Sequence, residues 1–385
     1  MKFDYDLFME ILSFLPVQTL LRFRCLSKAC CSCIDNPEFI NLHLKHTIKT
    51  DLNRSLVIHG LESKGSFYAI DLDSSRHIPL KLYISESNQR HRSDLQFHGN
   101  VFGSCNGLLA MYNGESILLW NPATRKHKTL PKFWGHCYGD YEMLHGFGYD
   151  ALNDDYKLIV MIEHYMENNV RVMVYSLKGK LLTSVKDLLG YTIFGSYHDT
   201  EPLGVFVGGS LHWVVQRKGN IRDGVILAFD LGDEKFFELP RPACMEDEYF
   251  FFHVQEIGGS LALYKSWAVW VDEVWIMKEY GVMESWSFIK KFEYLASKYH
   301  WFEYSEYHRP TPHDVRALCC LRKNTGDEVL LLLNRTGKYI CFYDFERGAI
   351  RKVVIFGSSH GYYCTISANI CVRSLVPVEF ISGIA

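Results

Sequence analysis

The feature that most constrains the fold of this chain is a short phrase that recurs along it. Its clearest copies are ILLWNPATRKHKTLP, which begins at Ile117, and ILAFDLGDEKFFELP, which begins at Ile226. Each copy is typical of a strand, a polar turn and a second strand, because β-branched and aromatic runs flank Asn, Asp, Gly and Pro. An internal repeat of this kind indicates one supersecondary unit that is used several times.

Looser copies begin at Tyr68, Val172 and Cys341, and a longer variant begins at Val274, which makes six. Most copies follow another strand-like run: LVIHG, GLLAMYN, KLIVMI, SLHWVVQ, SLALY and VLLLL. With one further strand before each run, the unit has four strands in about 50 residues, as in a kelch-type propeller blade. We therefore expect a mainly β fold, a six-bladed kelch-like β-propeller over residues 46–385. An irregular β-sandwich is the alternative.

The two ends of the repeat region complement each other. The first unit lacks its first strand, because residues 37–54 have the pattern of a helix and a linker. A surplus strand, YYCTISANICVRSLVPV, follows the last copy. If this C-terminal strand is the missing innermost strand of the first blade, the ring closes and two exposed sheet edges disappear. We expect the propeller to be closed in this way.

The segment before the repeats has helical spacing instead. A first helix is predicted from its apolar positions, which are Leu7, Phe8, Ile11, Leu12 and Leu15. Pro16 ends this helix, since proline has no amide donor. A second helix is expected from about Val17 to Ile34, and a third from Pro37 with Asn36 as its cap. Apolar residues cover more than one face, so one side faces the rest of the chain and the other implies a partner. A helical cap on a larger domain is the alternative.

The run DLFMEILSFLPVQTLLRFRCLSKACCSCIDNPEFINLHL resembles an F-box, most closely at EILSFLPVQTLLRFRC from Glu10 to Cys25. The resemblance implies that residues 1–45 form a three-helix F-box that docks on the Skp adaptor, and through it on the cullin, of an SCF ubiquitin ligase. The adaptor-facing residues that it implies are Leu7, Ile11, Leu12, Leu15, Pro16, Leu20 and Leu21.

Two positions depart from the F-box pattern. Phe3-Asp4 stands where the family has Leu-Pro, and Cys30 stands where it has a tryptophan. A lost indole leaves a void that costs roughly 3–5 kcal/mol unless the site repacks. A second interpretation therefore stays open, in which the chain is an F-box-derived propeller binding protein that no longer engages the adaptor.

The repeat region resembles the plant F-box-associated domain across residues 100–376. LLWNPATRKHKTLP, GFGYDALNDDYKLI and the late VRSLV carry this resemblance. Members are similar to kelch-type receptors, among them the S-locus F-box proteins of pollen, which act in self-incompatibility, and regulators of immune receptors. The resemblance implies a non-catalytic receptor that recruits a protein substrate for ubiquitylation. The repeats alone imply only a β-rich binding platform.

The order of strands in a four-stranded blade indicates which face would hold the substrate, because the connections between second and third strands lie on the same face as those between blades. Four long, aromatic-rich connections share one face, at 132–144, 190–202, 243–253 and 296–313, and long loops of this kind usually carry function. Exposed Trp, Tyr and Arg favour binding hot spots. The candidate substrate-binding residues are Trp134, Tyr138, Tyr197, Tyr249, Trp301, Tyr304, Tyr307 and Arg309. Each is alternatively an aromatic or long side chain packed between blades.

Charge and cysteine usage bear on the compartment and partners. A net charge of −3 gives no electrostatic case for nucleic acid or an anionic membrane. No window approaches the ~18 apolar residues that span a bilayer, and the N-terminus does not have the pattern of a signal peptide. Twelve scattered cysteines without a disulfide-like framework favour a reduced cytoplasmic or nuclear location.

Motifs that suggest catalysis or metal binding have better structural interpretations. GSSHG, Gly357 to Gly361, precedes a strand rather than the helix that a nucleophile elbow requires. Cys30-x-x-Cys33 lacks the second ligand pair of a zinc site. The spacing of the loop histidines, His300, His308 and His313, suits neither a helix face nor a strand face. We therefore expect no catalytic residues, no metal and no cofactor, which disfavours a propeller enzyme or lectin.

Overall fold

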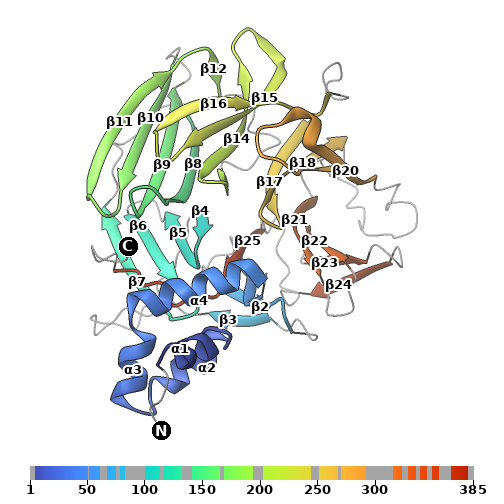
Figure 1. The fold of residues 1–385 in the computed structure, drawn as a ribbon. Coiled ribbons are helices and arrows are strands. Elements are labelled where there is room, and N and C mark those ends of the chain that lie inside the picture. The colour runs from blue at the N-terminus through green and yellow to red at the C-terminus, as the bar shows by residue number, and fades with distance from the viewer. Residues whose placement is uncertain are drawn as a thin grey trace.

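The structure is a computed structural model, shown in Figure 1. It describes residues 5–50, 52–60, 67–74, 79–82, 100–112, 116–131, 141–164, 169–193, 203–243, 251–267, 270–291, 315–322, 328–334, 339–344, 349–354 and 366–379. Four helices come first: α1 (Tyr5–Ser13), α2 (Val17–Phe23), α3 (Lys28–Ile34) and α4 (Pro37–Thr50). Strands follow, with one short 3₁₀ helix, η2 (Met283–Ser285), between two of them.

Within the described residues the strands form six antiparallel sheets, and we number these sheets one to six along the chain. Sheet one contains β25 (Ile366–Val372), β1 (Arg54–Gly60), β2 (Phe67–Asp71) and β3 (Pro79–Leu82). Sheet two contains β4 (Asn100–Cys105), β5 (Leu108–Tyr112), β6 (Ser116–Asn121) and β7 (Lys126–Pro131). Sheet three contains β8 (Tyr141–Asp150), β9 (Asp155–His164), β10 (Val170–Ser176) and β11 (Leu181–Leu188).

The later sheets follow the same order. Sheet four contains β12 (Tyr191–Thr192), β13 (Val205–Val207), β14 (Ser210–Arg217), β15 (Asn220–Asp230) and β16 (Lys235–Leu239). Sheet five contains β17 (Phe251–Ile257), β18 (Ser260–Trp267), β19 (Trp270–Met277) and β20 (Trp286–Lys291). Sheet six contains β21 (Val315–Arg322), β22 (Glu328–Asn334), β23 (Tyr339–Asp344) and β24 (Ala349–Val354). The prediction of a mainly β fold is confirmed.

Each of the six repeat copies forms the last two strands of its sheet, as predicted. The two clearest copies turn in the same way. The Asn121 Oδ1 atom accepts from the amides of the second and third residues after it, and the Asp230 Oδ1 atom does the same. Arg125 and Glu234 then take the left-handed conformation, with φ of 61° and 53°. The polar residue of the repeat therefore encodes the hairpin turn.

Neighbouring sheets meet through one strand from each sheet. β25 contacts β4, β4 contacts β8, β8 contacts β13, and the series continues through β17 and β21 back to β25. Figure 1 shows the sheets set side by side around the middle of the molecule, with the helices below one part of them.

The C-terminal strand lies beside the first strand after the helices. β25 pairs antiparallel with β1, from Arg54 opposite Val372 to Gly60 opposite Ile366. The first unit therefore receives its remaining strand from the other end of the repeat region.

The N-terminal segment has four helices, so the expectation of three is wrong. The predicted helix from Val17 to Ile34 is divided into α2 and α3. Ser27 is the reason: its backbone is extended, with φ −160° and ψ 160°, and its Oγ accepts from the Cys30 amide at 3.1 Å. A serine in this geometry starts a new helix. The predicted cap of α4 is correct, because the Asn36 Oδ1 atom accepts from the Glu38 amide at 2.8 Å.

The helices and the sheets share one hydrophobic core. Leu12, Val17, Leu20, Ile34 and Phe39 of the helices belong to the same buried cluster as residues of sheets two and three. The chain after β25, residues 373–378, contributes three further members of this cluster. We call residues 373–378 the C-terminal tail. The helical part is thus packed onto the β-structure.

Sheets three and four are joined by a buried lysine. Lys157 of β9 donates from Nζ to the Leu231 carbonyl at 2.5 Å, and it lies 2.8 Å from Glu234 and 3.0 Å from Asp150. Burial by itself would lower the pKa of Lys157, but the two carboxylates raise that pKa above its ordinary value. The lysine is therefore a charged bridge between sheets.

A buried histidine joins sheet four to sheet five. His212 of β14 contacts the Val205 carbonyl through Nδ1 at 2.9 Å and the Tyr280 hydroxyl through Nε2 at 2.7 Å. The neutral tautomer with its proton on Nδ1 satisfies both contacts, because that nitrogen donates and Nε2 accepts. Burial lowers the pKa of His212 to about 4. Protonation would place a charge in this dry site and remove the acceptor.

Candidate docking face of the N-terminal helices

The helices that carry the candidate adaptor-binding residues are held in a fixed arrangement. α4 packs against α1 and α3, and α2 packs against α3. His43 of α4 is fully buried, and its Nε2 lies 3.0 Å from the Leu15 carbonyl in the turn between α1 and α2. Burial lowers the pKa of His43, so the ring is neutral and donates from Nε2. This bond fixes the turn that Pro16 begins.

Two of the seven predicted adaptor-facing residues lie inside the molecule. Leu12 is 2% exposed and Leu20 is fully buried, and both belong to the core that the helices share with the sheets. They are core residues in this structure rather than surface residues. The sequence pattern could not separate them from the others, because the helices are apolar on more than one face.

The remaining five reach the surface to different degrees. Leu15 and Leu21 are half-buried, and Pro16 is exposed. Leu7 and Ile11 are 53% and 56% exposed, one turn apart on the outer side of α1. Leu7 and Ile11 lie on α1, Leu15 and Pro16 lie in the turn that follows it, and Leu21 lies on α2.

Phe14 belongs to the same surface although the sequence analysis did not single it out. It follows Leu7 and Ile11 at spacings of seven and three residues, and its side chain is 61% exposed. Its ring meets the ring of His46 edge-on, with centroids 4.3 Å apart. The i, i+4, i+7 spacing was the available signal. We call Leu7, Ile11 and Phe14 the α1 stripe.

A surface ion pair connects two of the helices. Arg24 donates to the Asp35 carboxylate at 2.7 Å, linking the end of α2 to the end of α3. Both side chains are partly exposed, so the pair contributes only about 0–1 kcal/mol. Cys30, the position at which the F-box pattern has a tryptophan, is half-buried, whereas Cys33 and Ile34 are the buried residues of α3. The deepest packing of α3 therefore does not depend on position 30.

The C-terminal tail is bound to sheet two through contacts that the sequence pattern does not reveal. Asn121 is fully buried and donates from Nδ2 to the carbonyls of Ser374 and Val376, at 3.1 and 2.8 Å. The Ser374 hydroxyl donates to the Asn106 carbonyl at 2.7 Å. Asn121 lies in WNPATRKHK and Ser374 in VRSLV, so two motifs that are far apart in the sequence are joined by hydrogen bonds.

Gly107 shows how closely the tail approaches sheet two. It has a φ of +84°, and a Cβ built there would lie 2.2 Å from the Ser374 Oγ and 2.6 Å from the Val372 carbonyl oxygen. Only glycine fits this position. The tail is therefore seated directly on the β4–β5 turn.

The eight candidate substrate-binding residues all lie outside the described residues, and so do His300, His308, His313 and Gly357 to Gly361. They stay predictions. Among the residues that the structure does describe, there is no group of His, Cys, Asp or Glu placed to hold a metal ion. In the same residues, no helix is long and apolar enough to span a membrane.

Comparisons with known proteins match both parts of the chain. Residues 2–42 match the F-box domain family, and residues 61–371 match the family described as F-box associated beta propeller domain. The F-box protein CPR1 of Arabidopsis thaliana is 29% identical over 96% of this chain and 88% of its own length. The Arabidopsis F-box protein At4g22390 is 26% identical over 96% of this chain and 89% of its own length. The Arabidopsis F-box/kelch-repeat protein At3g23880 is 26% identical over 72% of this chain and 76% of its own length.

Proposed function

Because this chain belongs to the F-box associated β-propeller family and carries an F-box before that domain, we propose that it is the substrate-recognition subunit of an SCF-type ubiquitin ligase. The F-box docks on a Skp-type adaptor, and through it on a cullin, while the propeller binds a target protein. The subunit has no catalytic residues of its own. It acts by position, since a bound target lysine meets the activated ubiquitin at high effective concentration.

The α1 stripe is the observation that carries this proposal. Three large apolar side chains, two on α1 and one in the turn directly after it, are more than half exposed, while other residues of the helices are buried in the core shared with the sheets. A contiguous exposed apolar surface marks an interaction site. Because the helices are packed onto the sheets, an adaptor bound to the α1 stripe would have a fixed position relative to the propeller.

We further propose that the six sheets are six blades of one closed ring. The series of contacts between sheets, which runs from β25 through β4, β8, β13, β17 and β21 back to β25, supports this arrangement. The pairing of β25 with β1 supports closure by the C-terminal strand. The target would then bind on the face that carries the long connections, with Trp134, Tyr138, Tyr197, Tyr249, Trp301, Tyr304, Tyr307 and Arg309 as candidate contacts.

The proposed setting is the cytoplasm or nucleus, with protein partners and without nucleic acid or membrane. Free thiols support a reducing compartment: the described cysteines Cys25, Cys30, Cys31, Cys33, Cys105 and Cys371 are all unpaired. The near-neutral net charge of −3 supports the exclusion of polyanions.

The test is co-expression of the full chain with a Skp-type adaptor and measurement of the complex mass by light scattering. The variant is the double substitution Leu7→Asp plus Ile11→Asp, because both side chains are exposed and can change without opening the core. Leu152→Asp is the matched control: Leu152 is 81% exposed on the β8–β9 turn of sheet three. Leu12 and Leu20 are unsuitable targets, since burying a charge there would unfold the helical part.

We expect a one-to-one complex for the wild type and for Leu152→Asp, and no complex for the double variant. A folded wild-type chain that forms no complex would refute adaptor docking. The chain would then be an F-box-derived propeller that binds its partner without ubiquitin transfer. If the double variant still forms the complex, the adaptor binds somewhere other than the α1 stripe.

A further inference from the structure

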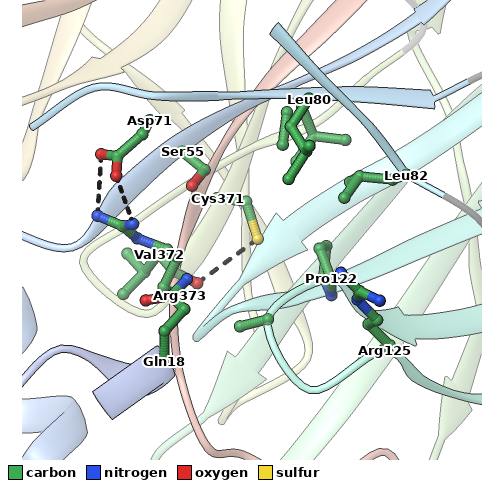
Figure 2. Close-up of a pocket in the computed structure, with 13 residues that line it drawn as sticks. Gln18, Ser55, Asp71, Leu80, Leu82, Pro122, Arg125, Cys371, Val372 and Arg373 are labelled. Atoms are coloured by element: carbon green, nitrogen blue, oxygen red, sulfur yellow. Dashed lines mark hydrogen bonds and ion pairs between the residues drawn. The ribbon is translucent and has the colours of Figure 1, made fainter. Parts of the chain in front are cut away.

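A cavity of about 340 Å³ lies between sheet one, the β6–β7 turn of sheet two and α2. Figure 2 shows its lining, with Gln18 of α2 on one side and the turn residues Pro122 and Arg125 on another. This volume falls within the range of small-molecule sites, about 300–1,000 Å³. Nothing in the proposed receptor role requires such a space.

The floor of the cavity is apolar and comes from one face of sheet one. Val57, Ala69 and Leu80 are register partners across β1, β2 and β3, so their side chains share a face. Leu82 and Cys371 line the cavity as well, and with Val57 they are buried in the apolar cluster between sheets one and two. Leu80 is 60% exposed at the mouth. The floor is thus a firm apolar surface with one open side.

The charges of the lining are arranged unevenly. Arg373 is held by Asp71 at 2.8 and 3.0 Å and by Asp73 at 2.6 Å, so this cation is neutralised. Arg125 lines the other end and is exposed on the hairpin turn, and within the described residues it has no ion-pair partner. One end of a cavity with an apolar floor therefore presents an arginine that has no ion-pair partner in the part of the chain that the structure describes.

Two buried donors stand next to the floor. The Trp120 Nε1 atom is buried and has no hydrogen-bond partner within the described residues, and Trp120 belongs to the same apolar cluster as Val57 and Cys371. The Asn369 Nδ2 atom is likewise buried without a partner in that part of the chain. Asn369 is the register partner of Val57 and lies two residues before Cys371, so it shares their face of β25. Neither Trp120 nor Asn369 lines the cavity, so the polar group of a ligand would have to pair with a lining residue instead.

We propose that this cavity binds a small amphipathic carboxylate. The apolar body of the ligand lies on Val57, Ala69 and Leu82, and its carboxylate pairs with the guanidinium of Arg125. An arginine matches a carboxylate in charge and in its forked geometry, which makes the pair selective. This proposal does not rest on the receptor role.

The test is calorimetric titration of the full chain with 4-phenylbutanoate, compared with 4-phenylbutanol and 4-phenylbutylamine as neutral and cationic analogues. Arg125→Gln removes the charge, and Ala69→Leu fills the space above the floor. Leu80→Glu is a third variant, at an exposed position, that places a repelling charge at the mouth without disturbing the core. Lys126→Gln is the matched control, since Lys126 is an exposed cation next to Arg125 that does not line the cavity.

We expect saturable binding of the carboxylate, weaker binding of the alcohol and weakest binding of the amine. Arg125→Gln and Leu80→Glu should each raise the Kd about tenfold or more, because a charge-assisted pair is lost or opposed. Ala69→Leu should abolish binding, and Lys126→Gln should leave it unchanged. Circular dichroism of each variant establishes that it is folded. No heat of binding from wild type at millimolar probe, or equal Kd values for the three probes or for Arg125→Gln and Lys126→Gln, would overturn the proposal.

Discussion

Replacing Asn121 by aspartate separates its two roles. The Oδ1 atom holds the β6–β7 turn, and Nδ2 donates to two carbonyls of the C-terminal tail. Asn121→Asp keeps an acceptor at the first position and puts a carboxylate oxygen in place of the donor. The same residue type already stands at the equivalent position of another repeat copy, Asp230, which serves only as a turn acceptor in the described contacts.

The magnitude follows from burial. Asn121 and Ser374 are fully buried, and Val376 is almost so, at 4% exposed. Leaving each of the two buried carbonyls without its donor costs about 1–3 kcal/mol. The desolvated carboxylate adds to this cost. We expect Asn121→Asp to lower the free energy of unfolding by about 3–5 kcal/mol, a large part of the ~5–15 kcal/mol typical of folded proteins.

Urea unfolding monitored by tryptophan fluorescence measures this loss, and the adjacent Trp120 is fully buried in the folded protein. We expect the midpoint to fall by about 1 M urea or more. The control Asp230→Asn keeps the Oδ1 acceptor and contacts no tail residue, so its midpoint should move by less than a third as much. Equal shifts for the two variants would show that the tail contacts contribute nothing and would refute the reasoning.

Three further predictions concern other parts of the sheets. His212→Gln should reduce the stability difference between pH 7 and pH 5 by about 2 kcal/mol in urea titrations. The folded-state pKa of about 4 lies below the unfolded value, so His212 contributes stability that is complete above pH ~6.5 and is lost as pH falls toward 4; an unchanged difference would contradict this. Lys157→Met should destabilise by about 3 kcal/mol in the same assay because it strands the buried Asp150 carboxylate, whereas the double variant with Asp150→Asn should recover part of that loss. Lys180→Gly should raise the free energy of unfolding by about 0.5–1 kcal/mol, and with it the melting temperature, because the exposed Lys180 has a left-handed φ of 49° that glycine adopts more easily. A lower melting temperature would show that the lysine side chain is needed.

The local features of the fold could be predicted from the sequence, because each depends on neighbouring residues. The six repeat copies, the stop at Pro16 and the cap at Asn36 are all set by patterns within one element or one turn. The break at Ser27 was missed although its signal is local. A serine inside an apolar run is compatible with a continuous helix, and only its extended backbone identifies it as a cap.

The contacts that organise the molecule depend on residues far apart in the sequence. Asn121 and Val376 are separated by 255 residues, and no spacing rule connects them. The same limit applies to Leu12 and Leu20, which carry the same apolar pattern as Leu7 and Ile11. Which face of α1 is covered is decided by where α4 packs against it, not by α1 itself.

The position of the C-terminal tail has a consequence for synthesis. Arg373 follows its partner Asp71 by 302 residues, and the core beneath the α1 stripe includes Leu375, Val376 and Val378. At about 5–20 residues per second, a ribosome needs about 15–60 seconds to make the intervening chain. The core that the helices share with the tail therefore cannot be completed until almost the whole chain has been translated. A truncated product would carry helices with an incompletely packed core, so only a chain translated through the tail would present the proposed docking surface in its folded form.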